Sequence, residues 1–167
     1  MDEAYLDVTE NKKQIESANQ IAREIRQKIY EQTGLTASAG ISINKFLAKV
    51  ASDINKTNGQ KTIHPDKVEK FLEELPVEKF YGVGKGTANK MFSLAIYKGK
   101  DLKNKQLEEL TRLFGKSGKY YYDVVRGIHH SHVKPHRIQK SVAVEQTFFE
   151  DLFDQQQIDE KLQNLSE

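Results

Sequence analysis

The order of strand, long amphipathic helix and strand near the start of the chain constrains its fold most. Residues 1–9 have strand composition without glycine or proline after Glu3. From about Lys12 to Thr33 a helix is predicted, capped by Thr9 or Asn11 and ended by Gly34, because apolar residues recur at i, i+3 and i+7. Residues 35–42 then resemble a small-residue strand. This order predicts a mixed α+β or α/β layer with a helix covering one face of a sheet.

A second helix is predicted from Asn44 to about Lys56, with Ser42 as its cap. Its inner side is apolar and consists of Phe46, Leu47, Val50 and Ile54. The following turn ends in Gly59, and a short strand is expected at residues 61–63.

Charge is unevenly distributed along the chain. Residues 1–75 carry 11 Lys/Arg and 12 Asp/Glu, residues 76–140 carry 14 and 5, and residues 141–167 carry 1 and 7. The basic middle favours a polyanionic partner, although a solvated lysine-rich surface gives the same counts. The chain has no cysteine, no apolar run near the ~20 residues of a membrane span and no secretory pattern. A cytoplasmic protein without membrane contact is therefore expected.

The basic middle reads as a set of short helices. Helices are predicted at residues 66–75, before Pro76, and at residues 105–114, before Gly115, and another follows around Tyr120 to Tyr122. Of these three tyrosines, two are expected in the core and one on the surface, where it could stack on a base.

A glycine-rich hairpin, F-Y-G-V-G-K-G-T-A-N-K, lies between two of these helices. Its backbone amides at a helix N-terminus suit a phosphate, and the spacing of a P-loop is absent. The alternative is a glycine-rich turn between packed helices. The candidate residues for contact with a nucleic-acid backbone are Gly82, Val83, Gly84, Lys85, Thr87 and Lys90.

Two adjacent carboxylates, Asp2 and Glu3, open the chain. In a strand they point to opposite faces, so at most one is buried. Taken by itself, the pair is either the solvated end of a strand or part of a functional site.

Read together, three stretches are similar to the Y-family (DNA polymerase IV-like) translesion polymerases. They are D-E-A-Y-L-D-V-T, the run from Gly40 to Gly59 that ends in K-T-N-G, and the glycine-rich hairpin, in the order in which the family has them. The resemblance covers nearly the whole chain. It implies a partial palm with strands and two covering helices at residues 1–63, an all-helical thumb with a helix–hairpin–helix element at 64–132, a linker at 133–140, and an incomplete α/β start of the little finger at 141–167.

The resemblance also implies roles for single residues. Asp2 and Glu3 would be catalytic carboxylates that hold Mg²⁺ in a two-metal site, and Tyr5 would support them. Lys56 would contact the incoming triphosphate, with Lys45 as a weaker phosphate candidate. The hairpin would hold duplex DNA through its sugar–phosphate backbone.

The family's first metal-binding aspartate, its fingers and the serine before the acidic pair have no counterpart in this sequence, so the chain is expected to begin inside the palm and to be inactive in primer extension. The implied partners are primer–template DNA and a deoxynucleoside triphosphate, with a sliding clamp for the intact protein. Two other classes stay open: a non-enzymatic DNA-binding module built on the hairpin, and a scaffold whose basic patch binds RNA or an acidic protein.

Towards the C-terminus, the histidines at 129, 130, 132 and 136 lack a carboxylate or cysteine at ligand spacing, so the tract is interpreted as part of a basic linker. A strand at 141–149 and a helix at 155–165 are predicted after it.

Overall fold

The computed structural model describes residues 3–135 and 141–166 of the chain. It divides into two compact units, Met1–Val133 and Lys134–Glu167. Within the described ranges, no helix is long and apolar enough to cross a membrane.

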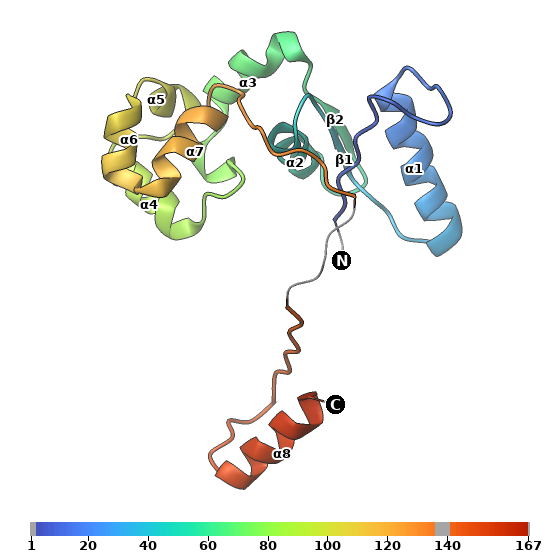
Figure 1. Cartoon of the computed structure of the whole chain (residues 1–167), viewed down its shortest axis with the longest axis vertical. Coiled ribbons are helices and arrows are strands. Elements are labelled where there is room, and N and C mark those ends of the chain that lie inside the picture. The colour runs from blue at the N-terminus through green and yellow to red at the C-terminus, as the bar shows by residue number, and fades with distance from the viewer. Residues whose placement is uncertain (1–2, 136–140, 167) are drawn as a thin grey trace. The chain divides into compact units, whose positions relative to one another are not determined.

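The first part of the larger unit is a mixed α/β layer (Figure 1). Strand β1 (Ala39–Ile41) pairs in parallel with β2 (Gln60–Thr62), and helix α2 (Lys45–Ile54) connects them. Gly40 makes this arrangement possible, because a Cβ atom there would lie 1.9 Å from the carbonyl oxygen of Ala48 in α2. Helix α1 (Ala18–Thr33) precedes the two strands.

Short helices follow and pack on one another (Figure 1). In chain order they are η1 (Pro65–Lys67), α3 (Val68–Glu74), η2 (Val77–Lys79), α4 (Lys85–Ser93), α5 (Gly99–Lys103), α6 (Leu107–Phe114) and α7 (Lys116–Val124). The mixed α+β fold expected from the sequence is thereby confirmed. Helix α5 was not predicted.

One hydrophobic core joins α2 to the helical part. All fully buried side chains of the described residues lie between Phe46 and Val125. The rings of Phe46 in α2 and Phe80 in the hairpin have centroids 5.8 Å apart. Helix α1 contributes no buried residue, so the mixed layer is anchored to the rest mainly through α2.

Helix α1 begins later than predicted. Ser17 is its N-cap, and its Oγ accepts a hydrogen bond from the Gln20 amide, whereas Asn11 closes a separate loop with Ile15. The cap at α2 is likewise Asn44 and not Ser42. Gly34 at the end of α1 is in the left-handed conformation, as predicted (φ 71°).

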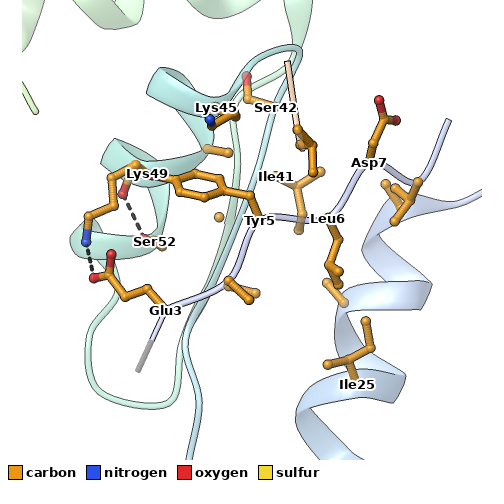
Figure 2. Close-up of a pocket in the computed structure, with 18 of the residues that line it drawn as sticks. Glu3, Tyr5, Leu6, Asp7, Ile25, Ile41, Ser42, Lys45, Lys49 and Ser52 are labelled. Carbon is orange, nitrogen blue, oxygen red and sulfur yellow. Dashed lines mark hydrogen bonds and ion pairs between the residues drawn. The ribbon is translucent and has the colours of Figure 1, made fainter. Parts of the chain in front are cut away.

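The predicted strand at the N-terminus is wrong for the residues the structure describes. Residues 3–8 are not assigned to a strand, and β1 pairs only with β2. The side chains still alternate, since Tyr5 points towards α2 and Leu6 towards Ile25 of α1 (Figure 2). The segment and β1 both line one cleft, and among the described residues no ladder joins them.

The smaller unit holds helix α8 (Gln155–Ser166), close to the helix predicted there. The strand predicted at 141–149 is wrong, because these residues have no ladder partner. Without a partner strand, backbone donors and acceptors are solvated and an isolated strand has no stability.

The three consecutive tyrosines of α7, of which two were expected in the core and one on the surface, follow this prediction only in part. Tyr121 is buried, while Tyr120 and Tyr122 are half-buried and pack against the core. None of the three tyrosine rings is therefore fully exposed, as a ring that stacks on a base would need to be.

Candidate functional site

A cleft of about 980 Å³ lies beside the acidic N-terminal segment. Residues 3–9 form one wall, and α1, β1, the first turns of α2 and residues 129–133 form the others. Figure 2 shows Glu3 and Tyr5 on the α2 side of this segment. Glu3 and Lys56 both line the cleft, so the structure brings these two predicted site residues to one place.

A chain of ion pairs connects Glu3 to Lys56. Lys49 Nζ lies 2.5 Å from Glu3 Oε1 and 3.2 Å from Asp53 Oδ2. Asp53 Oδ1 in turn lies 2.6 Å from Lys56 Nζ. Lys49 and Asp53 are one helical turn apart on α2, the spacing at which side chains on one helix face meet.

These contacts keep the lysine and aspartate charged. Burial acts to lower the pKa of Lys49, but hydrogen bonds to Glu3 and Asp53 outweigh it, so the pKa is raised above its ordinary value. Burial acts to raise the pKa of Asp53, but hydrogen bonds from Lys56 and Lys49 outweigh that effect and lower it.

The segment after α7 returns across α2 near the same cleft. Asn44 Nδ2 donates to the carbonyl of Gly127, and Lys45 Nζ donates to Ser131 Oγ at 3.1 Å. The Lys45 ammonium also lies 5.1 Å from the centre of the Tyr5 ring. Lys45 thus already has partners within the chain, which weakens it further as a phosphate ligand.

The glycine-rich hairpin ends at the N-terminus of α4. Gly82 has a positive φ of 88°, and Gly84 is the N-cap, where no side chain caps the first amides. Gly82, Gly84 and Lys85 are exposed, whereas Val83 and Thr87 are half-buried. The first amides of a helix have no intrahelical acceptor and carry the positive end of its dipole. The hairpin can therefore present several N–H donors to one anion.

Lys90 differs from the other hairpin candidates because it is engaged within the fold. Its Nζ donates to the carbonyl of Leu113 at 2.5 Å and lies 5.3 Å from the centre of the Phe114 ring. Lys90 therefore joins α4 to the end of α6.

Aromatic contacts place the hairpin next to α2. Tyr120 Oη donates to the carbonyl of Tyr81 at 2.7 Å, and the Tyr120 ring meets Phe46 edge-on with centroids 6.4 Å apart. Burial raises the pKa of Tyr120 to about 12, and burial together with the nearby Tyr81 hydroxyl raises that of Tyr5. The hairpin and the acidic segment accordingly approach each other through Tyr5 and Tyr81.

The described residues fit a hard divalent cation in part. Glu3 offers carboxylate oxygens, the ligands that Mg²⁺ prefers, on a side chain that is 51% exposed. Asp2 lies outside the described residues. Nowhere in the described ranges, the cleft included, does a group of three or more His, Cys, Asp or Glu residues lie so that it could hold a metal ion. His136 of the histidine tract lies outside these ranges.

Lys49, Asp53 and Arg26 were not predicted to belong to the site. Arg26 Nε donates to the carbonyl of Ala37, and its Nη2 donates to Asn58 Oδ1 at 2.8 Å, which ties α1 to the loop after Lys56. The K-x-x-x-D-x-x-K spacing on the predicted second helix was the available signal for the ion pairs.

Comparison with known proteins finds similar proteins over most of the chain. The impB/mucB/samB family matches residues 1–53. DNA polymerase IV 2 of Agrobacterium fabrum is 56% identical over 154 residues, which are 92% of this chain and 43% of that protein. DNA polymerase IV of Listeria monocytogenes is 51% identical over 162 residues, 97% of this chain and 46% of that protein. The chain thus spans less than half the length of these relatives.

Solved structures give the same result. DinB from Sulfolobus solfataricus aligns with a TM-score of 0.65 and 33% identity over 69% of this chain and 34% of that one. A ternary complex of Dbh aligns with a TM-score of 0.70 and 31% identity over 77% of this chain and 39% of that one. Together, the family match, these relatives and the similar structures support the expected recognition of the chain as a Y-family DNA polymerase fragment.

Proposed function

We propose that the chain is the later palm, the thumb and the start of the little finger of a translesion DNA polymerase, which transfers deoxynucleotides to a primer 3′-OH. The identity of 56% over 154 residues to a DNA polymerase IV carries this proposal, because an alignment of that length must include the hairpin. The family match at residues 1–53 includes the acidic segment. We assign residues 1–63 to the palm, 64–132 to the thumb, 133–140 to the linker and 141–167 to the little finger. The boundary between the two compact units, at Val133, supports the position of the linker.

In this proposal, the residues of the cleft divide the chemistry between them. Asp2 and Glu3 hold Mg²⁺, which when bound supplies charge stabilisation for the transferring phosphoryl group. Lys56, with a side chain that is 56% exposed at the cleft, neutralises the triphosphate of the incoming nucleotide. The oxygen of the 3′-OH bonds to the α-phosphorus as the bond between the α-phosphorus and the bridging oxygen of the β-phosphate breaks. The hydroxyl proton passes to water, and pyrophosphate leaves.

The thumb residues hold the primer–template duplex. The amides at the start of α4 donate to phosphate oxygens, and Lys85 adds a positive charge beside them. Such contacts read no base, which suits a polymerase that must move along any sequence. The relatives are bacterial enzymes and the proposed substrate is genomic DNA, so we place the whole protein in the cytoplasm. Its further proposed partner is a sliding clamp.

Duplex binding by the chain tests the thumb assignment. Fluorescence anisotropy across a salt series should show affinity that falls linearly in log[salt] and depends little on sequence. Lys85→Ala should weaken binding and reduce the slope by about 1, whereas Lys100→Ala, which removes a charge of α5 and not of the hairpin, should change both less. Binding that is insensitive to salt, or equal losses in the two variants, would contradict the phosphate grip.

Catalysis is tested in the full-length protein. Asp2→Ala should abolish primer extension and leave duplex affinity nearly unchanged. A parallel loss of both would argue against a catalytic carboxylate. The chain by itself should not extend a primer, and template-dependent incorporation by the purified chain would contradict this expectation.

A further inference from the structure

Four charged side chains of alternating sign connect two ends of the cleft wall. Glu3 comes from the N-terminal segment, Lys49 and Asp53 lie on α2, and Lys56 follows that helix. Each neighbour in this order is in direct contact, at 2.5, 3.2 and 2.6 Å. No other ion pair of the described residues links the acidic segment to α2.

Lys49 is the best-shielded member of this group. Its side chain is 12% exposed, against 51% for Glu3, 45% for Asp53 and 56% for Lys56. A shielded ammonium between two carboxylates is screened less by salt than an exposed pair and has few other positions to adopt. Both partners therefore compete for the same ammonium group.

We propose that Lys49 and Asp53 form an ion-pair relay that couples occupancy of the triphosphate position at Lys56 to the freedom of the Glu3 carboxylate. The roles of Lys56 and Glu3 in this relay rest on the proposed function. Lys49 and Asp53 are positioning residues, since they act through their two neighbours.

The relay follows from competition between anions for lysines. A triphosphate at Lys56 draws its ammonium away from Asp53, because a polyanion offers more charge than one carboxylate. Asp53 then has Lys49 as its remaining partner, and the contact between them tightens. Lys49 consequently releases Glu3, whose oxygens become available to a divalent cation. By linkage, a cation that takes Glu3 from Lys49 favours the triphosphate at Lys56 by the same factor.

Site-resolved NMR on the chain can separate the steps. Inorganic tripolyphosphate is titrated in the presence of EDTA, so that no metal bridges the two positions. The carboxyl carbon of Glu3 and the Nζ atoms of Lys49 and Lys56 are followed in the same titration. The variants are Asp53→Asn and Lys49→Met, which break the relay, and Lys49→Arg, which keeps its charge. The matched control is Asp123→Asn, which breaks another i,i+4 Lys–Asp pair, 2.7 Å long, on α7.

In the wild type and in Asp123→Asn, the Glu3 signal should shift with the same midpoint as the Lys56 signal. In Asp53→Asn, Lys56 should bind tripolyphosphate about 1.5- to 5-fold more tightly, because its intramolecular competitor is gone, while the Glu3 shift is lost. Lys49→Met should lose the Glu3 shift, and Lys49→Arg should retain it.

Three results would overturn the relay, and they fall into two groups that differ in meaning. If Lys56 responds and Glu3 does not, or if Glu3 responds equally in Lys49→Met, the relay is wrong although the triphosphate position stands. If Lys56 does not respond at all, the triphosphate assignment itself fails, and the relay fails with it.

Discussion

Replacing Gly84 with alanine should separate the folding of the helical part from its proposed grip on DNA. Gly84 has φ −80° and ψ 170°, which any residue adopts, and a Cβ atom there would meet no atom within 4 Å. Alanine is a poorer N-cap than glycine but restricts the unfolded chain, and these two small effects oppose each other. We expect the free energy of unfolding to change by less than about 1 kcal/mol.

Binding should respond much more strongly to the same methyl group. The methyl would occupy the exposed surface at the start of α4, where a phosphate approaches the amides. A hydrogen bond to a charged group contributes about 1.5–3 kcal/mol, so losing one lowers duplex affinity by roughly 10- to 100-fold. Because no charge is removed, the slope of log Kd against log[salt] should stay the same, in contrast to Lys85→Ala.

The assay combines urea unfolding with fluorescence anisotropy on one duplex at fixed salt. Gly82→Ala is the informative comparison, since Gly82 has φ 88° and alanine there strains the backbone. That variant should lose stability and binding together. If Gly84→Ala binds like the wild type, DNA does not approach the backbone at this position. If it unfolds, the account of the hairpin conformation is wrong.

Three further predictions concern the fold and can be measured by urea denaturation. Gly40→Ala should destabilise the chain by about 1–3 kcal/mol or prevent folding, because its Cβ would collide with the carbonyl of Ala48; an unchanged midpoint would contradict the close packing of β1 on α2. Leu72→Ala, at a fully buried position, should cost about 2–5 kcal/mol, and a loss below 1 kcal/mol would place Leu72 outside the core. Burial and the charge of Lys45 lower the pKa of His129 below the 6.5 of an unfolded chain, so the unfolded state binds the proton first and stability falls as the pH drops below about 6.5; His129→Phe should flatten this pH dependence, and an unaltered profile between pH 5 and 7.5 would assign it to other groups.

Stop signals in the sequence predicted the helix ends better than the helix starts. Gly34 and Gly115 end α1 and α6 with positive φ, and Pro76 follows α3, as their backbone preferences require. The starts were less certain, because several polar residues near α1 could cap it. Ser17 does so, since the loop closed by Asn11 uses the residues before it.

Strands were overpredicted because composition and alternation show only that a segment can be extended. They do not show whether a partner strand is present. Residues 3–8 keep the alternation that their sequence predicts, yet a ladder also needs a neighbouring edge within hydrogen-bond reach. For the described residues, β1 offers such an edge only to β2. Helix α5 was missed because a local hydrogen bond, and not a periodic pattern, fixes its start. Its start depends on Asp101, whose carboxylate accepts from the amides of Tyr97 and Lys98, a local bond that periodicity does not register.

The candidate site could be predicted residue by residue but not as an arrangement. The resemblance pointed to Glu3 and Lys56 separately. Their connection through Lys49 and Asp53 depends on the position of the N-terminal segment beside α2, which the sequence does not show. Lys90 illustrates the reverse, because a lysine in a basic hairpin reads as a phosphate ligand until its hydrogen bond to Leu113 is known.

The hairpin and the acidic segment are held in place by different interactions, and they therefore differ in rigidity. The hairpin is fixed by the core, through Phe80 and the Tyr120 hydroxyl, so the direction of its amides does not depend on a ligand. The acidic segment contributes no buried side chain to that core, and Glu3 is held by a single lysine. Partly exposed ion pairs contribute only about 0–1 kcal/mol each, so ligands of modest affinity can rearrange them. A rigid hairpin for the proposed duplex grip and an adjustable carboxylate at the cleft are therefore compatible in one small unit, since α2 carries the contacts of both.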